Sequence, residues 1–205
     1  MPKNFYVLPE LPYGYVDLAP VMSEELLKIH HDKHHAAYVA GANAILEKMD
    51  KAHTGGAELD PKAELKALSF NIGGHVLHSL FWENLAPANN GGGGEPGGKL
   101  AEKIKEDFGG FENFKAGFIK IAMTVEGSGW AALTYCLKTN RLIPMQVEKH
   151  NTNLYPNFKI IMAIDAFEHA YYLDYKNDKA RFFEAIWSVI NWKIVDERYK
   201  QVASL

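Results

Sequence analysis

Near the N-terminus, apolar residues recur at helical spacing from Leu26 to about Met49. Side chains three and four positions apart share one face of a helix, so this pattern predicts a long amphipathic helix. A loop over Lys51 to Glu58 follows, and Asp60-Pro61 then supplies an N-cap and a first helical residue. The second helix should run to about Leu85. Two long helices joined by so short a loop are expected to pack as an antiparallel hairpin.

The run NNGGGGEPGG, Asn89 to Gly98, interrupts this pattern. Glycine loses more backbone freedom in a helix or strand than any other residue, so the run predicts a linker. No GKS or GKT sequence follows, which argues against a phosphate-binding loop. We therefore predict two domains: a helical hairpin over residues 1–90 and a second domain over residues 91–205.

Beyond the linker, the pattern predicts an α+β domain with a small three-stranded antiparallel sheet surrounded by helices. A bend is expected near Asn177-Asp178 in an otherwise helical C-terminal part that starts at Glu168. The other expected elements are helices over Lys99 to Asp107 and Phe111 to Val125, a strand hairpin of Trp130 to Leu137 and Arg141 to Val147, and a buried strand over Phe158 to Ile164.

Composition narrows the class of protein without identifying it. An apolar fraction of 47% and a charged fraction of 23% are typical of a globular protein. The net charge of -3 gives no reason to expect a nucleic-acid partner, and no apolar run approaches the roughly 20 residues of a membrane helix. The N-terminus lacks a signal-peptide core. The single Cys136 suits a reducing compartment, so we expect a cytoplasmic protein.

Most of the nine histidines fall in short clusters. The first cluster is HHDKHHAAYV, in which His30, His34 and Tyr38 share one helical face, while His31 and His35 form a neighbouring stripe. Neutral imidazole is the commonest protein ligand for borderline metals, so such clustering indicates a metal site.

Two further clusters lie later in the chain. In GGHVLHSLFW, His78 shares its helical face with Gly74 and Trp82. In IDAFEHAYYL, Asp165 ends the predicted buried strand and His169 follows four residues later. A carboxylate at the end of an apolar strand is costly unless a cation or hydrogen bonds compensate it. A bound metal would do so, and a helix-capping role is the alternative.

Imidazoles together with a carboxylate suit a transition metal better than calcium or magnesium, and zinc also fits this set. The residue types alone do not separate redox chemistry from hydrolysis. No HExxH or GxSxG motif is present, and Cys136 has no basic neighbour to activate it as a nucleophile.

Motifs along almost the whole chain resemble those of the iron/manganese superoxide dismutases, and in detail the archaeal members. The matching stretches are LPELPY from Leu8, HHDKHHAAYV from His30, HSLFWENLAP from His78, EGSGWAALTY from Glu126, DAFEHAYYLDYKN from Asp165 and WSVINW from Trp187.

This resemblance implies an enzyme that converts two superoxide anions to oxygen and hydrogen peroxide at one redox-active metal ion. The metal ligands would be His30, His78, Asp165 and His169. Tyr38 and His34 would form the gateway for superoxide, with Trp82 and Trp130 lining the pocket and Lys33 helping to attract the anion. Glu168 and Tyr172 would lie at the interface of a homodimer or tetramer and reach the partner subunit.

The chain departs from the commoner family pattern at several positions. Phe167 stands where tryptophan is more usual, and Lys179 where arginine is more usual. The glutamine that hydrogen-bonds the metal-bound solvent is absent: Gly74 occupies one of its two usual positions, and His150 replaces it from the second domain. Members with such a histidine include iron and dual-metal enzymes, so we expect one iron ion per subunit, with manganese as the alternative.

Two other readings compete with this one. The same ligands could serve a mononuclear hydrolase or oxygenase, which would need an open pocket for an organic substrate; the predicted aromatic crowding favours a very small one. A non-catalytic relative of the fold should have lost a ligand, and none is lost here.

Overall fold

The computed structural model describes residues 5–56 and 58–205. An N-terminal arm leads into α1 (Glu24–Ile29), where Ser23 accepts a hydrogen bond from the Leu26 amide at 3.1 Å. A six-residue π-helical turn, η1 (His30–His35), follows without a break and continues as α2 (Ala36–His53). In that turn the amide of Ala36 donates to the carbonyl of His31, five residues back. The long first helix is therefore confirmed, but its wide turn was not predicted.

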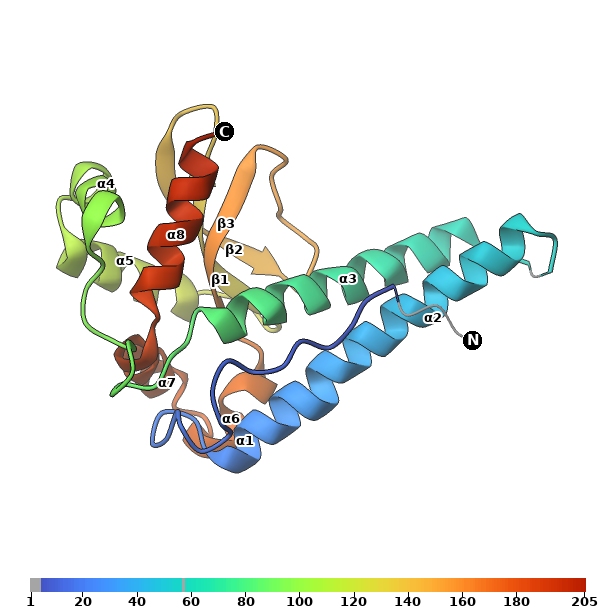
Figure 1. Ribbon diagram of the computed structural model, residues 1–205, viewed down its shortest axis with the longest axis horizontal. Coiled ribbons are helices and arrows are strands. Elements are labelled where there is room, and N and C mark those ends of the chain that lie inside the picture. The colour runs from blue at the N-terminus through green and yellow to red at the C-terminus, as the bar shows by residue number, and fades with distance from the viewer. Residues whose placement is uncertain (1–4, 57) are drawn as a thin grey trace.

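The second long helix is α3 (Pro61–Glu83), and Asp60 caps it as predicted by accepting from the amides of Lys62 and Ala63. Figure 1 shows α2 and α3 as a long pair that extends to one side of the molecule. Part of the predicted loop after α2 is in fact helical, since α2 continues to His53; residue 57 of that loop lies outside the described residues.

The sheet has the strand order β2-β1-β3 and is antiparallel throughout. The strands are β1 (Gly129–Cys136), β2 (Arg141–Glu148) and β3 (Phe158–Asp165), each within one residue of its expected bounds. Every residue of β1 is buried, so the central strand is covered on both faces. Helices α4 (Gly98–Phe108) and α5 (Phe111–Met123) also form near their predicted positions.

The C-terminal part is more broken than the single bend that we expected. It comprises η2 (Glu168–Ala170), α6 (Tyr172–Tyr175), α7 (Lys179–Ala185), η3 (Ile186–Val189) and α8 (Trp192–Ala203). Ile190 is extended because it pairs with Leu85 at the end of α3, and the amide of Asn191 donates to the carbonyl of Asn84. These contacts between distant segments interrupt a sequence that is locally helical.

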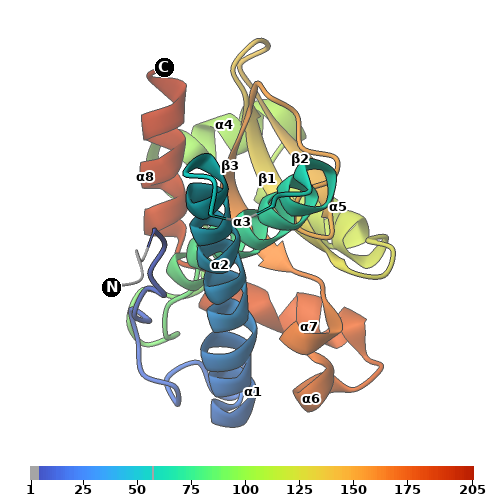
Figure 2. The ribbon, with the colours of Figure 1, turned by 90° about the vertical axis from the view of Figure 1, so that its right-hand side faces the viewer.

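The first helix and the segment after the sheet are joined directly. Ser23 donates from its amide and its hydroxyl to the two carboxylate oxygens of Asp174, both at 2.7 Å, and the hydroxyl of Tyr175 donates to the Val21 carbonyl. Figure 2 shows α6 and α7 close to α1. The start of the hairpin and the end of β3 are thereby held together, and the metal-ligand candidates lie on these elements.

Candidate metal centre

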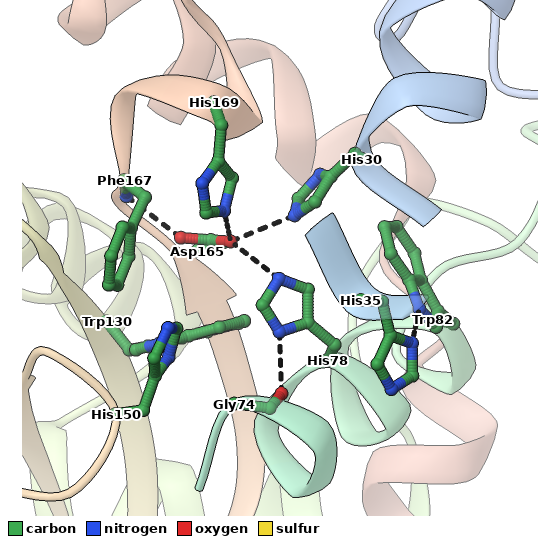
Figure 3. Close-up of polar contacts among 10 residues, drawn as sticks. All are labelled: His30, His35, Gly74, His78, Trp82, Trp130, His150, Asp165, Phe167 and His169. Atoms are coloured by element: carbon green, nitrogen blue, oxygen red, sulfur yellow. Dashed lines mark hydrogen bonds and ion pairs between the residues drawn. The ribbon is translucent and has the colours of Figure 1, made fainter. Parts of the chain in front are cut away.

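Four side chains from the hairpin and from the end of β3 converge on one point. One ligand atom from each of His30, His78, Asp165 and His169 lies within 4.8 Å of the other three. The Nε2 atoms of His30 and His169 are each 3.0 Å from Oδ2 of Asp165, and Nε2 of His78 is 3.5 Å from it (Figure 3). The structure thus brings together all four residues that the family resemblance selects.

This group fits a bound cation. His30, His78 and Asp165 are completely buried, and an isolated buried carboxylate is strongly disfavoured unless it is paired. The Nδ1 of His78 donates to the carbonyl of Gly74 at 2.6 Å, which leaves Nε2 unprotonated. That Nε2 has no hydrogen-bond partner among the described residues, so its lone pair is free for a metal ion.

The electrostatic environment keeps the donor atoms in their metal-binding forms. Burial lowers the pKa of His30 to about 4 and the pKa of His78 well below its ordinary value, so both rings are neutral at pH 7. For Asp165, burial opposes ionisation, but His169 and His30 more than offset it and hold the pKa below its ordinary value. Three imidazoles and one carboxylate form a ligand set suited to iron, manganese or zinc.

Asp165 also has a structural role at the end of β3. The amide of Phe167 donates a hydrogen bond to Oδ1 of Asp165 at 2.8 Å, so the carboxylate caps the turn after this strand.

Tyr38 and His150 lie together beside His78. Their ring centroids are 4.6 Å apart, and the Tyr38 ring is 5.2 Å from that of His78. His150 is completely buried and accepts a hydrogen bond at Nδ1 from the indole of Trp130, at 3.0 Å. Its Nε2 has no partner among the described residues and therefore carries the proton of a neutral ring.

His34 lies elsewhere in the centre, stacked on the ring of His169 at 4.3 Å. It lines a surface hollow together with Glu168 and Tyr172, the two predicted interface residues. Lys33 and Lys179 are separate from this group: Lys33 is exposed, and Lys179 donates to the carbonyl of Val125 at 3.2 Å.

Phe167 replaces the more usual tryptophan without leaving the centre open. Its ring stacks on His150 at 4.5 Å, with the two planes 7° apart, and on His169 at 4.9 Å. The site is therefore crowded by aromatic rings, as we predicted from the sequence.

Two features of this centre were not predicted from the sequence. Phe70 on α3 lies against both Tyr38 and His150, at 5.7 and 4.7 Å. Gly73 and Gly74 have no side chains for a specific reason: a Cβ on Gly73 would lie 2.2 Å from the His150 carbonyl oxygen, and one on Gly74 would meet the Tyr38 ring. The FNIGG sequence offered a signal, since paired glycines inside a helix indicate a close approach by another segment.

The chain is similar to known proteins along almost its whole length. Residues 5–86 match the family model described as iron/manganese superoxide dismutases, alpha-hairpin domain, and residues 96–198 match the C-terminal domain of the same family. The chain is 56% identical to a superoxide dismutase [Fe] of Methanothermobacter marburgensis over 97% of this chain and 98% of that protein. It is 54% identical to a superoxide dismutase [Fe] of Methanothermobacter thermautotrophicus, over 98% and 97% of the two chains. A superoxide dismutase [Mn/Fe] of Aeropyrum pernix is 48% identical, over 96% and 91%.

Proposed function

Because the chain belongs to the iron/manganese superoxide dismutase family, we propose that His30, His78, Asp165 and His169 bind the redox-active metal ion of this enzyme. The protein is a superoxide dismutase, which converts two superoxide anions to oxygen and hydrogen peroxide. The observation that carries the ligand assignment is the convergence of three imidazoles and one carboxylate, with ligand atoms within 4.8 Å of one another. No other part of the described chain offers such a group.

A bound iron ion would supply the one-electron chemistry, taking an electron from one superoxide, which leaves as oxygen, and giving it to a second, which leaves as hydrogen peroxide with two protons. The protein must admit a small anion, exclude larger molecules and supply those protons. The rings of Tyr38, Phe70, Trp130 and Phe167 crowd the ligands, which favours a very small substrate over the organic molecule that a hydrolase or oxygenase would need to admit.

We assign proton handling to Tyr38, His34 and His150. Burial and, to a smaller extent, the charge of Asp165 raise the pKa of Tyr38 to about 12, so its hydroxyl keeps its proton at neutral pH. Burial lowers the pKa of His34, which leaves a neutral ring that can accept a proton and pass it on. His150 holds its proton at Nε2, next to the ligands, because the Trp130 indole occupies Nδ1. Each of these groups lies against a proposed ligand.

We further propose that the chain forms a homodimer or tetramer through the surface around Glu168 and Tyr172. A hollow beside His34 and His169 is lined there by three large apolar residues that are more than a third exposed: Ile29 at 38%, Tyr172 at 48% and Leu173 at 37%. Apolar residues grouped around a functional site are typical of an interface. In such an assembly Glu168 would reach the partner's copy of the centre.

Light scattering on the wild type and on Leu173→Lys tests this proposal. The variant should be monomeric, and a monomeric wild type would contradict the proposal.

A cytoplasmic location is proposed because the single Cys136 is buried and unpaired. Among the described residues, no helix combines the length and the apolar character needed to cross a membrane.

The metal and the activity can be tested together. Protein purified from its native source should contain about one iron ion per subunit. Metal-free protein should regain activity when iron is added, and the same reconstitution is carried out in parallel with manganese. Activity with manganese alone would correct the choice of metal. Failure to retain either metal would refute the assigned ligand set.

A further inference from the structure

His35 is a completely buried histidine that lies beside the metal centre and offers it no ligand atom. It comes from the end of the π-helical turn, and its ring is stacked on that of His78 at 5.3 Å and 22° (Figure 3). The proposed reaction gives this residue no role. A buried imidazole requires partners for its ring nitrogens, and those of His35 identify what it holds in place.

The hydrogen bonds of His35 have a fixed direction. The indole of Trp82 is only a donor, and its Nε1 lies 2.9 Å from Nδ1 of His35. Nδ1 is therefore unprotonated, and the ring carries its proton on Nε2. That Nε2 is 2.9 Å from Nδ1 of His75, which must accept the bond. Donation thus runs in one direction, from Trp82 through His35 to the half-buried His75.

Trp82, which donates a hydrogen bond to His35, packs against His30, one of the proposed metal ligands. Trp82 is 1% exposed, and its ring lies 4.7 Å from that of His30, at 75° to it. A metal-bound histidine is usually oriented by a hydrogen bond from its other ring nitrogen. His78 has such a bond to the Gly74 carbonyl, whereas Nδ1 of His30 has no partner among the described residues. Away from its Nε2 contact with Asp165, the ring of His30 is therefore oriented by the rings packed around it.

From these contacts we propose that His35 is a positioning residue of the metal centre, which fixes Trp82 against His30 and so orients a ligand whose Nδ1 has no hydrogen bond. His75 supports this role by selecting the tautomer of His35 that can accept from Trp82. The inference rests on the proposed function, because it assumes that His30 binds the metal.

Two substitutions at one position test the proposal. In His35→Asn, the amide oxygen stands near the place of Nδ1 and can still accept from Trp82, whereas His35→Leu removes the acceptor. The readouts are the electron paramagnetic resonance spectrum of the iron(III) protein, which reports the symmetry of the ligand field, and the affinity for iron in competition with a chelator. His35→Leu should change the spectrum and weaken iron binding about tenfold or more. His35→Asn should remain close to the wild type. An unchanged His35→Leu, or equal changes in both variants, would overturn the proposal.

A second variant covers the case in which His35→Leu does not fold. Trp82→Phe keeps a ring against His30 but removes the N–H donor, so it should alter the spectrum by itself. An unaltered Trp82→Phe spectrum would show that His35 does not act through the indole. Where His35→Leu does fold, fully additive effects in the double variant would show the same. If the wild type itself binds no iron, the proposed function fails; if it binds iron and these variants behave like it, only this inference fails.

Discussion

The ring of Tyr38 occupies the space in which residue 74 would carry a side chain: a Cβ on Gly74 would lie 2.7 Å from Cγ of Tyr38. The tyrosine can lie against His78 only because α3 has no side chain at that point. The same contact explains why a polar residue at position 74 is incompatible with the present position of Tyr38. The polar side chain beside Tyr38 is instead that of His150, which comes from the loop after β2.

We expect Gly74→Ala to displace Tyr38 and Gly73→Ala to displace the main chain at His150. Forcing a methyl group into a packed site costs about 1–3 kcal/mol of unfolding free energy, and both variants should also lose turnover. Gly117→Ala is the matched control, because this helical glycine on α5 has nothing within 4 Å of the added methyl group. That variant should be neutral or more stable by up to about 1 kcal/mol. Urea unfolding and steady-state kinetics provide the comparison.

Replacing His78 with alanine should abolish both metal retention and activity, because the remaining ligands are too few to hold the ion. Elemental analysis after dialysis measures the effect. His53→Ala, at the exposed end of α2, serves as the control and should bind metal normally. Normal metal content in His78→Ala would remove this residue from the ligand set.

Tyr38→Phe should keep the metal, since the ring remains packed against His78, but lose the hydroxyl to which we assign proton supply. Proton transfer by a positioned side chain is commonly worth a factor of about 100 or more, so turnover at high superoxide concentration should fall by at least about tenfold. Pulse radiolysis resolves this regime and any change in product inhibition. Kinetics identical to the wild type at every superoxide concentration would argue against the gateway role.

Acid should destabilise the metal-free protein between pH 6.5 and about 4. Burial lowers the pKa of His30 and His150 to about 4 and that of His35 to about 3, whereas in the unfolded chain each ring has its ordinary value near 6.5. The unfolded state therefore takes up protons first as the pH falls, and each histidine contributes a loss of about 1.4 kcal/mol per pH unit within that window.

Urea midpoints of the metal-free protein at pH 7, 6, 5 and 4.5 would show this loss. His150→Gln and His35→Asn should each flatten the pH dependence, because a ring that titrates differently in the two states has been removed. A midpoint that does not change with pH would contradict the expectation.

Much of the fold could be predicted from local patterns. The helical spacing after Leu26, the Asp60 cap and the three apolar strand segments all formed as predicted, because each depends on residues that are close in the sequence. The segment after Glu168 was predicted less well. Its local pattern is helical throughout, and only the pairing of Ile190 with Leu85, 105 positions earlier in the chain, makes it extended there.

In the candidate site, too, local patterns could not reveal contacts between residues that are far apart in the sequence. Spacing indicated which faces carry histidines, but it could not say which ring of HHDKHH reaches Asp165; the resemblance to a family selected His30, and the structure places it there. Spacing also gave no partner for His75. The structure shows it hydrogen-bonded to His35, because the two long helices pack along their length and bring residues 40 positions apart together.

The π-helical turn gives the first helix one extra residue between His30 and His35. In a regular α-helix, side chains five positions apart point about 140° away from each other. Across the wide turn, the amide of Ala36 reaches the carbonyl of His31, five residues back, so residues at this spacing come onto the same side. His30 and His35 accordingly both lie against His78 and Trp82. The helix thus holds four residues between these two rings without turning Leu26 and Leu27 away from the core.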